Sequence, residues 1–267
     1  MVNKIVAKKA SIRFEPLGVT TLKSKLEALQ EALRDRFPKS KMPRMQAFNI
    51  DLTNPNSIQV DQDGAHELHM VSADNVHALK IGNQGFDYSI RGYVSYEHQR
   101  EMFLHVVDLA MRTMDVKYVG HLSVHNINMF AFDAEGAAAN IRENSPFAAK
   151  DKGIDDSWQH VGAATRHDYE LDDGLVGLVI HSTIAQEGQS FIPQPEWELW
   201  QLMGGIPVVQ ERSLLLTIAV AHNQEGKAQR TPQGVSLVNL DLEDVANKFD
   251  LVHEHLNRTY DSITKES

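Results

Sequence analysis

The chain has 267 residues, of which 42% are hydrophobic and 23% are charged, proportions that suit a packed globular protein. It contains no cysteine, which excludes structural disulfides, cysteine-based zinc sites and a thiol nucleophile. The formal net charge of −10 disfavours nucleic-acid binding, whose footprint is a basic surface, but does not exclude a local basic patch.

Apolar runs in this chain are short. None approaches the roughly 18 residues that a membrane span requires, and the N-terminal MVNKIVAKKA lacks the apolar region of a signal peptide. We therefore expect a cytoplasmic protein that has no membrane partner.

The first part of the chain alternates strand and helix signals. Leu22, Leu26, Leu29 and Leu33 recur at helical spacing, with Thr20 or Thr21 as the cap. A second stripe of Met102, Phe103, Val106, Ala110 and Met114 follows Ser95, which can cap that helix. The predicted elements are strands at 4–15, 45–52, 67–72, 77–81, 86–93 and 115–132, and helices at 21–37 and 96–114.

Periodicity is lost over 133–158 and returns afterwards as strands. Asp172-Asp173-Gly174 predicts a hairpin between strands at 161–171 and 175–186. Further strands are predicted at 208–222 and 234–241. A final helix over 242–264 carries the stripe Val245, Phe249, Val252, Leu256 and Tyr260, with Asp241 as its cap.

These patterns predict an α+β fold with two β-rich halves, largely antiparallel sheets, and helices packed on the sheet faces. The predicted division is a first domain at 1–133, a connector at 134–158 and a second β-rich domain at 159–267 that ends in the C-terminal helix.

The strand at 115–132 carries the most distinctive polar residues. Leu122 and Val124 are apolar on one face, but from Ile127 onward the apolar positions switch phase. A β-bulge produces such a slip, and it would gather His121, Ser123, His125, Asn126 and Asn128 on one side. We interpret this side as a surface that faces a ligand or partner; the alternative is a strand buried on both faces with its histidines hydrogen-bonded in the core.

Histidine chemistry offers a second interpretation. The chain has 13 histidines, and His121, His125 or His167 are candidates for a general acid and base because histidine titrates near neutral pH. His121 and His125 share a face of the strand but lie roughly 13 Å apart at ~3.3 Å per residue, too far to share one metal ion. We predict no metal site and no cofactor.

The segment at 188–207 combines three prolines and three glycines with large apolar residues, among them Trp197, Trp200 and Met203. Exposed residues of these types mark interfaces, so we predict contact with a protein partner or a second copy of the chain. The alternative is a loop that folds over the core as a lid.

Several stretches together resemble a sporadically distributed family of bacterial proteins of about 250 residues that has no settled function. They are SIRFEPL, RDRFP, HELHMVSADNVHALKIGNQGFDYSIRGY, VGHLSVHNINMF and NLDLEDVANKFDLVHEHLNRTYDSIT, and they cover nearly the whole chain. Matching positions are Ile127-Asn128, Asp241, His253, Tyr260 and Ile263-Thr264. His121 and His125 stand where the family tends to have arginines, so an anion-binding role for those arginines does not carry over. The resemblance implies a bacterial or phage origin and supplies no catalytic residues.

The sequence therefore favours a non-enzymatic, cytoplasmic binding or assembly protein, in a bacterial defence or mobile-element system, with a protein partner or self-association. The alternative is a hydrolase or ribonuclease that uses histidine acid-base catalysis.

Overall fold

The computed structural model describes residues 5–43, 47–50, 58–61, 67–132, 138, 140–148, 164–171, 175–223, 238–239 and 241–265. Its helical elements are α1 (Val19–Leu33), α2 (Tyr96–Met114), the short 3-10 turn η2 (Gln194–Glu196), α3 (Trp197–Leu202) and α4 (Leu242–Ile263). Its strands are β1 (Ile5–Phe14), β2 (Lys39–Lys41), β3 (Ala47–Ile50), β4 (Ile58–Asp61), β5 (Leu68–Val71), β6 (His77–Gly82), β7 (Gly85–Arg91), β8 (Tyr118–Ala131), β9 (Ala164–Leu171), β10 (Val176–Ala185), β11 (Ser213–Asn223) and β12 (Val238–Asn239).

One large sheet runs through the molecule in the order β2-β5-β6-β7-β1-β8-β11-β10-β9, with β12 paired to β8, while β3 and β4 form a separate two-stranded sheet. All the strand pairs among the described residues are antiparallel. The predicted α+β class with antiparallel pairing is confirmed. Two separate halves are not, because β8 joins β11 in a continuous ladder across the predicted division.

The order of the strands is mirrored about the central pair β1–β8. Outward from β1 come β7, β6 and β5, and outward from β8 come β11, β10 and β9. On each side the strand that comes last in the chain, β7 or β11, lies beside the central strand. Helix α2 follows β7, and α4 follows β11 after the short strand β12. The connector predicted at 134–158 lies largely outside the described residues.

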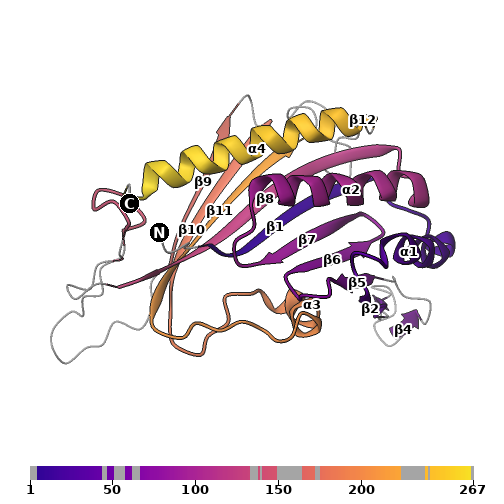
Figure 1. Ribbon diagram of the computed structural model, residues 1–267, viewed down its shortest axis with the longest axis horizontal. Coiled ribbons are helices and arrows are strands. Elements are labelled where there is room, and N and C mark those ends of the chain that lie inside the picture. The colour runs from indigo at the N-terminus through magenta and orange to yellow at the C-terminus, as the bar shows by residue number, and fades with distance from the viewer. Residues whose placement is uncertain are drawn as a thin grey trace.

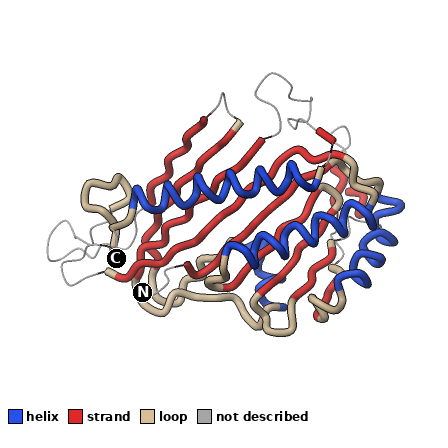
Figure 2. Tube along the Cα trace, turned by 45° about the horizontal axis from the view of Figure 1, so that its top comes forward, coloured by secondary structure: helices blue, strands red, loops and turns tan. Residues whose placement is uncertain are grey.

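Helices α1, α2 and α4 lie on one side of the sheet, as Figures 1 and 2 show. Their apolar stripes are buried as predicted, and they form one core with the facing side chains of the strands. The ring of Phe249 on α4 lies 4.8 Å from that of Phe103 on α2, centroid to centroid, so these two helices pack through aromatic contacts above the sheet. Tyr260 is only partly buried.

Two of the three predicted caps are confirmed. The Ser95 hydroxyl accepts a hydrogen bond from the His98 amide, and the Asp241 carboxylate accepts one from the Glu243 amide. Helix α1 instead begins after Gly18, which has no side chain to cap it, so the prediction of Thr20 or Thr21 was wrong.

Close packing of β7 on β1 depends on one glycine. Gly85 has a φ of 152°, and a Cβ atom there would lie 2.2 Å from the carbonyl oxygen of Ile12. Because no side chain fits this approach, only glycine lets β7 start against β1 at this point. The contact fixes the register that brings Asp87 of β7 opposite Ser11 of β1.

Candidate functional site

Strand β8 is regular where the sequence predicts a bulge. It pairs with β11 without interruption from His121 to Ala131. Its pairing with β1 shifts register at two places, between Ile5 and Ala7 and between Arg13 and Phe14 of β1. At the first of these the extra residue is in β1 and not in β8. The predicted gathering of five polar residues on one side is therefore wrong.

The two asparagines of that group face the helices. Asn126 and Asn128 share the alternation of Leu122, Val124 and Phe130, and all five are buried. The Asn128 amide donates to the carbonyl oxygen of Leu216 at 3.2 Å. The side-chain oxygens of Asn126 and Asn128 have no hydrogen-bond partner among the described residues. These two side chains thus belong to the core.

His121, Ser123 and His125 lie on the other face of the sheet, which we call the open face because α1, α2 and α4 do not cover it. His121 Nδ1 lies 2.9 Å from Asn223 Oδ1, and His125 Nε2 lies 3.2 Å from Ser123 Oγ. Burial lowers the pKa of His121, and the nearby Asn223 oxygen only partly offsets this. Burial, with a smaller effect of the Lys9 charge, lowers the pKa of His125 to about 4. His125 is therefore uncharged at pH 7.

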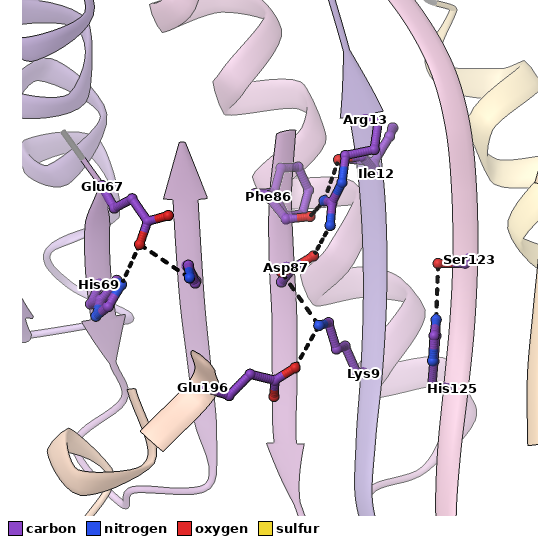
Figure 3. Close-up of polar contacts among 11 residues, drawn as sticks. Lys9, Ile12, Arg13, Glu67, His69, Phe86, Asp87, Ser123, His125 and Glu196 are labelled. Atoms are coloured by element: carbon purple, nitrogen blue, oxygen red, sulfur yellow. Dashed lines mark hydrogen bonds and ion pairs between the residues drawn. The ribbon is translucent and has the colours of Figure 1, made fainter. Parts of the chain in front are cut away.

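Charged residues of β1 and β7 lie beside His125 on the open face (Figure 3). Lys9 Nζ on β1 lies 2.7 Å from Glu196 Oε1 and 3.4 Å from Asp87 Oδ2. Arg13 donates to Asp87 Oδ1 at 2.8 Å. Burial by itself raises the pKa of Asp87, but the charges of Lys9 and Arg13 more than offset it and hold that pKa below its ordinary value. This group of charges is compensated within the protein.

The segment at 186–212 packs onto the open face. Trp200 and Met203 are each 1% exposed and form a cluster with Ala7, Val71 and Ala78 of the sheet. The prediction that Trp200 and Met203 face a partner is wrong for this fold, and the alternative of a loop folded over the sheet describes them. Trp197 is 38% exposed and donates its Nε1–H to the carbonyl of Ile192, so it stays a candidate for contact with a partner.

A cleft of about 560 Å³ lies between this segment and the open face. We call it the open-face cleft. Its polar lining includes Lys9, Ser89, His125, His181, Thr183, Gln189, Ser190, Glu196 and Thr217. Its apolar lining includes Ile127, Phe191, Ile192, Trp200 and Leu215. Five strands and one connecting segment therefore combine into a concave site that presents one polar and one apolar set of side chains.

Two polar atoms at the cleft are buried without a partner. Ser89 Oγ and Trp200 Nε1 each expose less than 1 Å² and have no hydrogen-bond partner among the described residues. Polar groups that are buried in this way are usually satisfied by water or a ligand. The indole N–H can only donate, so any group that satisfies it must bring an acceptor atom.

The three histidines proposed for catalysis are not brought together. His167 lies on β9, where its neighbours in the pairing place it on the face opposite to His121 and His125. There its ring contacts the edge of Phe147 at 5.1 Å between centroids. Within the described residues no group of three or more histidine and acidic side chains has the geometry to hold a metal ion.

Sequence reasoning missed most of the cleft. Lys9, Asp87 and Ser89 come from strands that were predicted, but their faces were not assigned. The alternation Lys9, Ser11, Arg13 in the first strand is a signal that could have identified a second polar strand. The contribution of Glu196 has no such signal, because it depends on where its segment folds.

A scan against models of known protein families finds no match to this chain, and no curated protein matches it significantly. The resemblance to a bacterial family therefore stays a prediction. None of the described helices is long and apolar enough to cross a membrane.

Proposed function

We propose that this chain is a non-enzymatic binding protein that takes a small, uncharged organic molecule into the open-face cleft. The single observation that carries the proposal is that two residues lining this concave and largely apolar site, Ser89 and Trp200, each bury a polar atom that has no partner among the described residues.

The size and lining of the cleft support this class of ligand. Pockets for small molecules usually measure about 300–1,000 Å³ and combine apolar walls with a few polar groups that fix orientation. The open-face cleft, at about 560 Å³, falls inside this range. Phe191, Ile192 and Trp200 supply the apolar wall against which a ring or an alkyl chain can pack.

The charge state of the cleft supports an uncharged ligand. Two lysines line the cleft: Lys9 contacts the carboxylates of Glu196 and Asp87, and Lys8 donates from its Nζ to the carbonyl of Val94. His125 carries no charge at pH 7 because burial holds its pKa near 4. A charged ligand would lose its hydration without gaining a free counter-charge from these residues. The loss of hydration on burying an ion costs on the order of several kcal/mol.

Unpartnered donors favour a ligand that bears an acceptor. Leaving a buried polar group unsatisfied costs about 1–3 kcal/mol. A carbonyl, ether or ring nitrogen placed near Trp200 Nε1 would remove that cost on binding. The ligand we propose is therefore neutral, ring-bearing or aliphatic, and carries at least one acceptor atom.

One contact favours the second candidate, a hydrolase. His125 Nε2 lies 3.2 Å from Ser123 Oγ, which is within reach for a base that activates a hydroxyl nucleophile. A base with a pKa of about 4 is far below the value near 7 that suits this role, and for this reason we place binding first.

We further propose that the parts at 1–133 and 159–267 are two related β-rich halves, each with a helix packed on the shared sheet. The mirrored strand order about β1–β8 supports this division. A cytoplasmic location and a role in a bacterial defence or mobile-element system remain predictions.

The test uses Nile red, an uncharged aromatic dye with a carbonyl acceptor, whose fluorescence rises in apolar sites. Thr217 lines the cleft from β11, while Ala221 lies on the same strand and the same face outside it. Thr217→Phe fills the cleft, and Ala221→Phe is the matched control that adds the same ring elsewhere.

We expect the wild-type protein to bind one dye molecule. Thr217→Phe should weaken binding by at least about tenfold, a change of 1.4 kcal/mol, while Ala221→Phe should stay within about twofold of wild type. Equal binding by all three proteins, or no saturable binding by the wild type, would reject the cleft as the site. A hydrolase would instead turn over ester or phosphodiester substrates and lose that activity on Ser123→Ala.

A further inference from the structure

Strand β9 forms one end of the large sheet. Among the described strands it pairs only with β10, and no described strand lies along its outer backbone edge. Six of its eight residues are exposed. The edge of a strand of this length can accept another strand through its backbone amide and carbonyl groups.

The other end of the sheet differs. There β2 has only three residues, and a very short edge strand is a common protection against pairing. The two ends of the sheet are therefore not equivalent, and β9 is the end suited to adding a strand.

Charges along β9 are of both signs and alternate with apolar residues. Arg166, Asp168 and Glu170 share one face, while His167, Tyr169 and Leu171 share the other. A row of like charges would repel a second copy of the strand, but this row is mixed. Arg166 already contacts Asp168 of its own strand at 2.9 Å, so the two side chains extend along the same surface.

Antiparallel self-pairing centred on His167 matches these charges. Residues that are directly opposite then have numbers that add to 334, which places Arg166 opposite the partner's Asp168 and Asp168 opposite the partner's Arg166. Side chains so placed have Cβ atoms about 4.5–5.5 Å apart and interact favourably when their charges are opposite. Centring on Asp168 instead would set that carboxylate against the partner's Asp168, which is unfavourable.

Apolar exposure on the other face of β9 supports the same arrangement. Tyr169 and Leu171 are 46% and 48% exposed, which is unusual for two large apolar residues on one strand. In the His167-centred register Tyr169 lies opposite the partner's Thr165, and the ring would lose exposed area to it. The edge position of β9, its mixed charges and its two exposed apolar residues thus point to a second copy of this chain as the strand that pairs with it.

We propose that two copies of this chain associate through β9, edge to edge and antiparallel about His167, so that their sheets become continuous. The interface is isologous, with the same seven residues, 164–170, on both sides. Backbone hydrogen bonds join the edges, and the reciprocal pairs between Arg166 and the partner's Asp168 set the register.

Charge reversal tests both the association and the register. Arg166→Asp and Asp168→Arg each create two like-charged pairs across the interface, so each full-length variant should sediment as a monomer at concentrations at which the wild type is a dimer. In an equimolar mixture the two variants present opposite charges to each other, and a mixed dimer should form. Glu170→Lys is the control, because in this register Glu170 lies opposite the partner's Ala164.

All three positions are exposed, so the variants should keep the wild-type circular dichroism spectrum. A wild type that is monomeric at about 100 μM, which for a dimer would mean a binding free energy weaker than about −5.5 kcal/mol, overturns the proposal. Single reversals that dimerise normally also overturn it. Loss of the dimer in Glu170→Lys, with no rescue in the mixture, would reject the His167-centred register.

Discussion

The two faces of the large sheet contain polar residues for different reasons. On the helix-covered face, Asn126 and Asn128 lie within a continuous apolar core, and their side-chain oxygens lack a partner among the described residues. On the open face, His121, Ser123 and His125 adjoin charged residues that are paired with one another. Polar residues of β8 that face the helices are thus tolerated within the core, whereas those on the open face lie in or beside the cleft.

Two consecutive residues of β8 differ in this way. Asn126 faces the helices, whereas His125, the residue before it, faces the cleft. What covers each face decides the role of the side chain. Helices cover one face with apolar stripes, whereas the segment at 186–212 covers the other only in part and leaves a cleft.

The largest expected effect lies on the helix-covered face. Phe249 is fully buried and stacks on Phe103, so Phe249→Ala should lower the free energy of unfolding by about 3–5 kcal/mol. Urea unfolding measures the change. Ser123→Ala on the open face is the comparison, and we expect it to cost less than about 1 kcal/mol because it removes one modest hydrogen bond. Equal losses would contradict the distinction between the faces.

The second effect is a pH dependence of stability that comes from the open face. The pKa of His125 lies near 4 in the folded protein and near 6.5 when unfolded. As the pH falls from 6.5 to 4, the unfolded chain binds a proton at this residue and the folded chain does not, so stability is lost as the pH falls. At about 1.36 kcal/mol per pKa unit, the loss is up to about 3 kcal/mol.

His125→Gln should remove that part of the acid destabilisation. We expect the difference in unfolding free energy between pH 7 and pH 4.5 to be smaller in this variant than in the wild type, as measured by urea unfolding at both pH values. His77, His121, His222 and His253 also have lowered pKa values, so part of the dependence should persist. An unchanged difference would show that His125 is not held uncharged.

A smaller effect separates the core asparagines from the cleft. Asn128→Leu replaces a fully buried side chain by an apolar one of similar size. It removes an acceptor without a described partner, but also the hydrogen bond that the amide donates to the Leu216 carbonyl. Because these effects oppose each other, we expect the unfolding free energy to change by less than about 1 kcal/mol and Nile red binding to be unchanged. Loss of dye binding would mean that the helix-covered face contributes to the site.

The smallest effect concerns the ion pair that ties the segment to the sheet. Lys9 and Glu196 are each about one-fifth exposed, and Lys9 keeps its contact with Asp87 when Glu196 is changed, so Glu196→Gln should cost less than about 1 kcal/mol. Hydrogen exchange should accelerate in 186–203 but not in α4. Equal protection in both proteins would indicate that the remaining contacts hold the segment, among them the apolar packing of Trp200 and the hydrogen bond from Arg91 to the Gly205 carbonyl.

The helices were predictable from sequence because their signal is local. The stripe of Leu22, Leu26, Leu29 and Leu33 buries one face of α1 whatever it packs against, and the structure buries all four. The strands β5, β6 and β7 were likewise found from alternation and turn residues. The joining of both halves of the chain in a single sheet was not predicted, since the pairing of β8 with β11 joins residues about 90 positions apart.

The candidate site was predictable only in part. His121, Ser123 and His125 share a face, as alternation indicated. The change of phase at Ile127 was attributed to a bulge, but its cause is a change in what covers the open face. Ile127 packs against the cluster around Trp200, and Met129 packs against the cluster around Val209. An apolar residue there reflects contact with a segment 70 residues away, which local pattern does not contain.

The tryptophans provide the most direct measurement of the central claim, that the open-face cleft binds a neutral ligand through unpartnered donors. In proton–nitrogen NMR spectra the indole N–H of Trp200 should shift downfield as Nile red is added, because it gains an acceptor that it lacks in the free protein. The indole N–H of Trp197 already donates to the carbonyl of Ile192 and serves as the internal control, so its resonance should move little. Substitution of each tryptophan by phenylalanine assigns the signals. Saturable binding of the dye with no shift of the Trp200 resonance would contradict the account.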